Sequence, residues 1–214
     1  MVRTWGVVIW VVVLAMAVAL AIRFAPPARA QPATGLVLNE ILAGPARDWD
    51  GDGLFDARKD EWVEIRNDGG ATVDLAAYRL ADADSTIRFA FTGLLAPGGV
   101  VLVTGTAALD WQRAAGRSAT GLSLNNSGDT VHLFQIAGAD TMAVDVKSYN
   151  SIEGATDRST GRFGGAWVLF DALNKYTGSG EPKGSGCPPT PGAENGCTTK
   201  VSETTWGWIK ANYR

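Results

Sequence analysis

The sequence has few of the residues on which metal and redox chemistry usually depend. Its 214 residues include only one histidine and two cysteines. It contains no Cys-x-x-Cys pair and no His-Glu-x-x-His motif, and zinc prefers thiolate and imidazole ligands. Gly-x-Ser-x-Gly and phosphate-binding glycine loops are also absent. The motifs of the common zinc, thiol-exchange and nucleotide-binding enzymes are therefore excluded.

Long helical patterns are also missing. Beyond residue 30, apolar residues do not recur with a sustained period of 3.6, and there are neither heptads nor internal repeats. Without heptads the chain has no basis for a coiled-coil rod. The segment 109–116 (LDWQRAAG) predicts one helical turn or a loop.

What the sequence does contain is a series of short segments with a period of two. Each is rich in Val, Ile, Leu or Phe and is bounded by Gly, Asn, Asp or Pro, which is typical of β-strands joined by turns. The expected strands are 35–42, 61–67, 85–91, 99–105, 129–136 and 142–149, with one or two more in 72–82 and a weaker candidate at 165–170. Their spacing predicts an all-β fold, either a sandwich or a barrel.

The first 30 residues have the pattern of a secretory signal peptide. Arg3 precedes an apolar run over 5–22, and Ala28-Arg29-Ala30 forms a cleavage site of the A-x-A type. The apolar run is also long enough to span a bilayer as an uncleaved anchor. Both alternatives place residues 31–214 outside the cytoplasm, as a secreted, periplasmic or cell-envelope protein.

The part that follows this leader is acidic. Residues 1–30 contain three of the 19 basic side chains and none of the 22 acidic ones, so residues 31–214 have a formal net charge of −6. Negative charge repels the phosphate backbone. The composition therefore argues against nucleic acid as the main partner.

The two cysteines, Cys187 and Cys197, lie close together near the C-terminus. In an exported chain such a pair predicts a disulfide that closes a short loop. A metal pair is the alternative, but no further thiolate or imidazole lies nearby in the sequence. We expect the disulfide to hold the C-terminal segment and to contribute ~2–3 kcal/mol.

The segment 48–61 (DWDGDGLFDARKDE) concentrates like charges in a stretch too rich in glycine for a helix. Counted from its first aspartate, it matches the first half of an EF-hand calcium loop, with a glycine at position 6. The candidate ligands at positions 1, 3, 5, 7 and 9 are Asp48, Asp50, Asp52, Leu54 (through its carbonyl oxygen) and Asp56.

The second half of this loop departs from the pattern. Position 12, where a bidentate carboxylate belongs, is Lys59. Asp60 and Glu61 follow directly, so a slightly longer loop can supply the missing acid. EF-hand helices are not required for this chemistry.

A cation offsets the repulsion within such a loop. Neighbouring carboxylates repel by ~1 kcal/mol per pair even at the dielectric constant of water. Calcium accepts flexible oxygen ligands, whereas magnesium demands a tighter octahedron and zinc prefers nitrogen and sulfur. The pattern therefore predicts a structural calcium site. The alternative is a solvated acidic turn without an ion.

Several of these segments, taken in order, resemble the lamin tail domain family in its bacterial form. The motifs are LVLNEIL, DEWVEIRNDGGATVDLAAYRLAD, LLAPGGVVLVTG, LSLNNSGDTVHLF, DVKSYNS and TPGAENG, over about residues 35–197. The resemblance implies an immunoglobulin-like antiparallel β-sandwich over 31–197. It also implies a binding or scaffolding module, because in bacteria such domains are often exported and attached to nucleases or phosphoesterases. A fold alone does not define a function.

Five further residues carry chemistry that the sequence leaves open. His132 lies mid-strand, where a packed or surface histidine is the alternative to a catalytic triad. Glu40 and Glu64 form either a glycosidase pair or, as the default, structural hydrogen bonds. Asp82 and Asp84 are expected to end a strand and shape a turn.

The tail 198–214 lies beyond the segments that resemble the family. Trp206, Ile209 and Tyr213 have the spacing of one helical face. This face either folds back onto the sandwich or serves as a docking peptide.

Together these features predict a non-catalytic binding or scaffolding module with a calcium loop. The expected partner is a protein or glycan of the cell envelope, and membrane contact is expected only through an uncleaved leader. A metal-dependent hydrolase of phosphoesters or glycans is the alternative.

Overall fold

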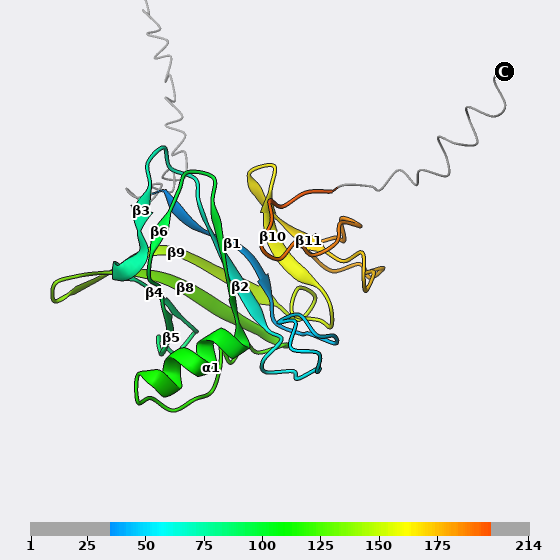
Figure 1. Cartoon of the computed structure of the whole chain (residues 1–214). Helices are drawn as coiled ribbons and strands as arrows, with labels where there is room; N and C mark the ends of the chain where they lie inside the picture. The colour runs from blue at the N-terminus through cyan, green and yellow to red at the C-terminus, as the bar shows by residue number, and fades with distance from the viewer. Residues whose placement is uncertain (1–34, 198–214) are drawn as a thin grey trace, which may run out of the picture. The chain divides into compact units, whose positions relative to one another are not determined.

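The computed structural model describes residues 35–197, so the expected leader (1–30) and aromatic tail (198–214) lie outside the described residues. Figure 1 shows antiparallel β-strands and one short α-helix. The elements are β1 (Leu36–Leu42), β2 (Trp62–Asn67), β3 (Val73–Asp74), the 3₁₀-helix η1 (Leu75–Ala77), β4 (Tyr78–Ala81), β5 (Ile87–Ala90), β6 (Leu94–Leu95), β7 (Val100–Thr104), α1 (Gly105–Ala114), β8 (Gly128–Ala137), β9 (Asp140–Asn150), β10 (Ser159–Phe163) and β11 (Ala166–Phe170).

The strands form two larger sheets and one small one. The five-stranded sheet has the order β11-β10-β1-β2-β7, and the four-stranded sheet has the order β5-β4-β8-β9. The two-stranded sheet pairs β3 with β6. The core lies between the two larger sheets and combines aliphatic residues of both, such as Leu38, Ile65, Leu80 and Leu133. This mostly antiparallel arrangement is consistent with an immunoglobulin-like β-sandwich.

The first strand is buried along its whole length, unlike a strand with one solvated face. Its apolar residues Leu36, Leu38 and Ile41 belong to the core. Asn39 and Glu40 are also fully buried, because residues near the end of the described chain cover them. The segment that covers β1 therefore positions candidate site residues such as Glu40.

The expected helical turn or loop at 109–116 was wrong in length and start. An α-helix of 10 residues begins at Gly105, directly after β7, and ends at Ala114. The side chain of Thr104 caps it by accepting a hydrogen bond from the backbone N–H of Ala107, at 3.2 Å. The cap residue is also the last residue of β7, so the strand pattern over 99–105 hid the start of the helix.

Strand β10 (STGRF) was not predicted from the sequence, and it pairs with both β1 and β11. Its first three residues, Ser159, Thr160 and Gly161, are small and buried. A Cβ atom on Gly161 would lie 2.7 Å from Asn195 Nδ2 and 3.0 Å from Glu40 Cγ. Small residues are therefore needed where β10 packs against Glu40 and Asn195. Because these residues are not large and apolar, the strand has no apolar pattern in the sequence.

The predicted bend in 72–82 is confirmed by β3, η1 and β4. The expectation for Asp82 and Asp84 is also confirmed, since β4 ends at Ala81 and a turn follows. In this turn the N–H of Ser85 donates to the carbonyl oxygen of Asp82 at 3.0 Å. Among residues 35–197 no helix has the length and hydropathy needed to cross a bilayer.

Candidate metal-binding loop

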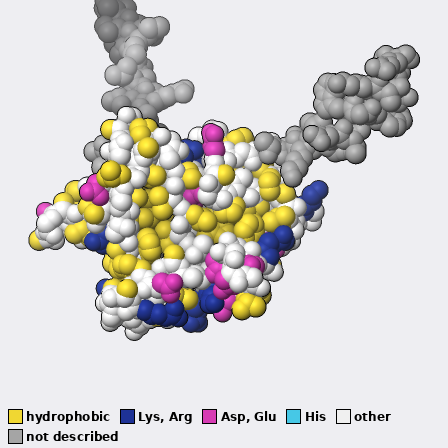
Figure 2. Space-filling view, viewed as in Figure 1, with side chains coloured by type: hydrophobic (Ala, Val, Ile, Leu, Met, Phe, Trp, Pro, Cys, Tyr) yellow, Lys and Arg dark blue, Asp and Glu magenta, His cyan; other side chains and the backbone are white. Residues whose placement is uncertain are grey.

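The acidic segment 48–61 lies in the connection between β1 and β2. It is the cyan loop beside α1 in Figure 1, and Figure 2 shows acidic and basic side chains gathered along that edge of the molecule. Carboxylate oxygens of Asp48, Asp50 and Asp60 lie within 4.8 Å of one another. Three of the seven predicted ligand residues therefore converge, and their oxygens are the kind that calcium prefers.

Asp60 organises the loop through hydrogen bonds to backbone N–H groups. Its side chain is fully buried, and its Oδ1 accepts the backbone N–H groups of Trp49 (2.6 Å) and Asp50 (3.1 Å). Its Oδ2 accepts the N–H of Asp56 at 2.7 Å. Asp60 thus joins the two ends of the loop through these three hydrogen bonds.

Asp48 holds the first turn of the loop in the same way. Its carboxylate accepts the N–H groups of Gly51 (2.7 Å) and Gly53 (2.8 Å). Both glycines have positive φ, at 79° and 86°, which explains why glycine alternates with aspartate in this sequence. Asp50 is fixed from the opposite side, because the hydroxyl of Thr106 in α1 donates to its Oδ2.

Asp52 and Asp56 are engaged elsewhere. Asp52 forms an exposed ion pair with Lys59 at 3.0 Å, and the hydrogen bond from Lys59 lowers the pKa of Asp52. Asp56 accepts the backbone N–H groups of Arg58 and Lys59, which lower its pKa. The side chain of Leu54 is 69% exposed, and its N–H donates to Asp52. Asp52 and Asp56 do not belong to the group of converging acids, and the predicted role of the Leu54 carbonyl oxygen stays a prediction.

Glu61 faces away from the converging acids. Its buried carboxylate accepts the N–H of Leu124 at 3.3 Å, and burial raises its pKa to about 8. Successive side chains at the start of a strand point to opposite sides. Asp60 therefore points into the loop, whereas Glu61 points toward the segment before β8.

One residue that connects the loop to the rest of the protein was not predicted from the sequence. Asp157, between β9 and β10, accepts hydrogen bonds from the N–H of Ala46 (2.9 Å) and the indole of Trp49 (3.3 Å). The guanidinium of Arg47 binds it through two N–H groups, at 2.9 and 2.8 Å. A separation of 110 residues gave no local signal for this contact. Asp157 consequently holds the start of the loop, and α1 contacts the loop at Asp50.

Glu40 and Glu64 are opposite each other in β1 and β2, and both side chains are fully buried. Thr190 donates to Glu40 through its N–H and its hydroxyl, the latter at 2.6 Å, and Ser159 donates to Glu40 as well. The N–H of Gly192 donates to Glu64 at 2.7 Å. Burial raises the pKa of Glu40 to about 7 and also raises that of Glu64. The default expectation of hydrogen bonding is confirmed.

We call residues 187–197 the C-terminal clasp. The predicted disulfide between Cys187 and Cys197 closes it. Within it, Asn195 accepts a hydrogen bond from the Asn39 side chain at 2.9 Å and donates to the carbonyl oxygen of Asn39 at 3.1 Å. The clasp covers the polar face of β1 and β2, so the two glutamates face hydrogen-bond donors of the protein.

His132 stacks on Phe134 in β8, with ring centroids 5.3 Å apart and an angle of 4° between the ring planes. Within the described part of the chain, no hydrogen bond or ion pair joins it to a carboxylate. His132 is half-buried in its strand, which matches the packed or surface histidine expected as the alternative to a triad.

A family model described as Lamin Tail Domain matches residues 29–151, which is more than half of the chain. The match includes β1 to β9, whereas β10, β11 and the C-terminal clasp follow it. No curated protein matches the sequence.

Proposed function

Because the chain belongs to the lamin tail domain family, we propose that it is a non-catalytic binding or scaffolding module outside the cytoplasm. One observation carries the proposal: the buried glutamates that resemble a glycosidase pair are covered by the C-terminal clasp and hydrogen-bonded to it. Carboxylates held in this way stabilise the fold and have no room for a substrate. The disulfide favours a secreted or cell-envelope location, since such bonds persist in oxidising compartments.

The proposal includes a structural calcium ion at Asp48, Asp50 and Asp60. The three acids converge on a loop already fixed by backbone N–H groups, so little of the protein has to be ordered by the ion. Calcium takes six to eight oxygen ligands, so backbone carbonyls and water would complete the shell. The ion would stabilise the loop and with it the connection between β1 and β2.

The test is calorimetric and thermal titration of the full chain with calcium. Extracellular calcium modules bind with Kd values of about 10⁻⁴–10⁻³ M, and a ligand at about 10 times its Kd stabilises by about 1.4 kcal/mol. We expect millimolar calcium to raise the melting temperature more than magnesium does. Asp50→Asn should abolish the shift, while Asp140→Asn, on the β8–β9 hairpin, should keep it.

Two results would count against this proposal. The absence of both heat and a melting shift at millimolar calcium would leave the solvated acidic turn. Metal-dependent turnover of a phosphodiester or glycan substrate, lost in Asp50→Ala, would instead establish the hydrolase alternative.

A further inference from the structure

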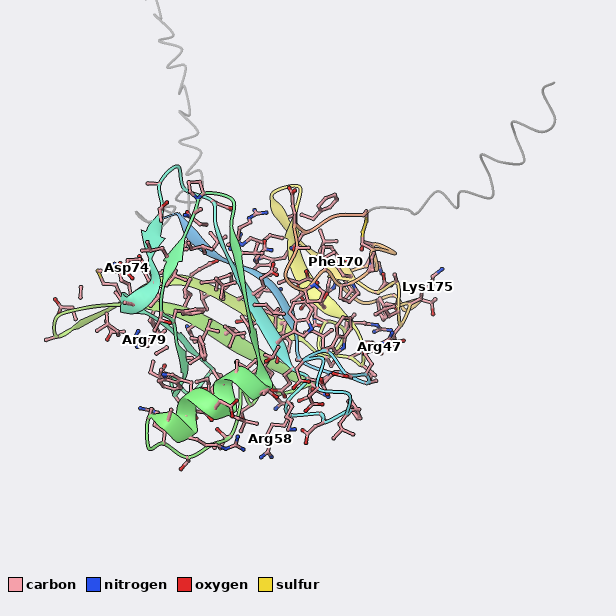
Figure 3. All side chains as sticks on the ribbon, viewed as in Figure 1. Arg47, Arg58, Asp74, Arg79, Phe170 and Lys175 are labelled. Atoms are coloured by element: carbon pink, nitrogen blue, oxygen red, sulfur yellow. A yellow bond between two sulfur atoms is a disulfide. The ribbon has the colours of Figure 1, made fainter. Side chains whose placement is uncertain are left out.

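An open cleft of about 1020 Å³ lies between the acidic loop, the β4–β5 turn and the segment that enters β8. Arg58, labelled in Figure 3 near α1, lines it on the loop side. Arg88 is the second guanidinium of the lining. The lining carries more acids than bases, and its carboxyl groups are those of Asp56, Glu61, Asp82, Asp84 and Asp129.

Asp82 is the most informative of these acids because its residue is only 7% exposed. Arg88 holds one of its oxygens, Oδ2, through Nε at 2.7 Å and through Nη2. The other oxygen, Oδ1, is buried and receives no donor from the described residues. A buried carboxylate oxygen without a donor costs free energy, so this atom favours a ligand that carries N–H groups.

The neighbour of this oxygen is another acid. Burial and then the Asp84 carboxyl raise the pKa of Asp82, while the interaction with Asp82 lowers the pKa of Asp84 to about 2. The Asp84 side chain is 66% exposed, so the pair opens to solvent. A cationic N–H donor between the two carboxyl groups would take the place of a shared proton.

The guanidinium of Arg88 is already engaged by groups of the protein itself. Besides Asp82, its Nη1 donates to the Thr120 hydroxyl at 2.6 Å, and its Nη2 lies 3.9 Å from Asp84. The side chain of Gln112 fixes the strand beneath by donating to the carbonyl oxygen of Arg88 at 2.9 Å. Arg88 therefore neutralises one carboxylate of the pair, and the cleft keeps an excess of negative charge.

The distribution of the acids distinguishes an extended cation from a metal ion. Among the described residues, the cluster with metal-ligand spacing is that of the acidic loop, and Asp82, Asp84 and Asp129 are outside it. A calcium ion needs six to eight oxygens around one point. Carboxylates spread over three chain segments instead match a ligand with several separated positive charges.

We propose that this cleft binds a basic segment of a partner polypeptide and receives a lysine or arginine side chain between Asp82 and Asp84. The proposal names the partner chemistry of the binding module and rests on that proposed function. Lysine and arginine carry the cationic N–H donors that the free oxygen of Asp82 lacks. Asn125 and Asn126 offer neutral polar groups to the backbone of such a segment.

The experiment measures binding of fluorescent peptides of alternating arginine and glycine, or lysine and glycine, to the full chain at low ionic strength. A serine–glycine peptide is the neutral control. Asp84→Asn removes an exposed negative charge, whereas Asp82→Asn removes the buried negative charge and replaces one of the two acceptor oxygens with an amide group. Asp140→Asn is the matched control, since Asp140 begins β9 and lies at the opposite end of the β8–β9 hairpin from Asp129.

We expect the basic peptides to bind and the neutral peptide not to bind. Charged hydrogen bonds of about 1.5–3 kcal/mol correspond to a loss of affinity of about tenfold or more in Asp82→Asn and Asp84→Asn. Asp140→Asn should bind like the unmodified chain. The melting temperature of Asp82→Asn shows whether this variant is folded. If it is unfolded, the affinity of Asp84→Asn alone decides the test.

Four outcomes would overturn the proposal. The first is that neither basic peptide binds, and the second is that all three variants lose peptide affinity equally. The third is that a glucosamine oligomer binds more tightly than the peptides. The fourth is that the heat of calcium binding disappears in Asp82→Asn. Calcium stabilisation that depends on Asp50 is measured separately, so failure of the loop proposal and failure of the cleft proposal give different results.

Discussion

The buried carboxyl of Glu40 predicts that the protein becomes less stable as the pH rises through neutrality. Burial raises the pKa of Glu40 from 4.5 to about 7 in the folded state. Between these values the folded state binds more protons than the unfolded state, so the free energy of unfolding falls as the pH rises. Each pKa unit corresponds to about 1.4 kcal/mol, so the loss due to Glu40 is about 3 kcal/mol.

Urea unfolding of the full chain at pH values between about 5 and 8 measures this loss, with Glu40→Gln as the comparison. Glutamine keeps an oxygen for the Thr190 and Ser159 donors but does not titrate. The variant should therefore lose about 2–3 kcal/mol less than the unmodified chain over this range. Glu61, whose pKa burial raises to about 8, acts in the same direction in both proteins, so the difference isolates Glu40.

The pH range avoids the acids with lowered pKa values. Asp52 and Asp56 have folded pKa values below the ordinary 3.8, so the stability that they contribute is lost only as the pH falls through that region. Identical slopes for the unmodified chain and Glu40→Gln would refute the reasoning. They would mean that Glu40 ionises without cost and that the clasp does not isolate it from water.

Two further predictions concern covalent and steric constraints. Replacing Cys187 and Cys197 by serine opens a loop with a sequence separation of 10 and should cost about 3 kcal/mol in urea unfolding; equal midpoints with and without the bond would contradict a stabilising role. Gly105→Ala places a Cβ atom 1.9 Å from the carbonyl oxygen of Arg58, so it should destabilise by about 1–3 kcal/mol or more. Gly70→Ala, with no atom within 4 Å, is the control, and a similar melting temperature for both variants would count against the close contact.

The period-two pattern predicted the sheets because it reports burial on one face of a strand. This pattern gave most of β2 and β8: buried and half-buried residues partly alternate in β8, whereas β2 is buried at five of its six positions. It missed β10, because the small residues of that strand pack against the clasp and offer no apolar alternation. It also hid the start of α1, since the capping Thr104 is at the same time the end of β7.

Local spacing predicted part of the candidate metal-binding loop. Asp48, Asp50 and Asp60 converge, but local spacing alone did not separate Asp60 from Glu61. Their opposite directions follow from the strand that begins immediately after them. Asp157 was out of reach of any local reasoning because it approaches the loop from more than 100 residues away.

The position of the clasp determines when the polar side chains of β1 can become covered during folding. Asn39 and Glu40 belong to the first strand, whereas their partners Thr190 and Asn195 follow roughly 150 residues later. A chain that emerges from its N-terminus during synthesis or translocation therefore exposes these polar side chains until almost all of it has passed. The polar partners of β1 are therefore supplied by a segment that is synthesised about 150 residues after it.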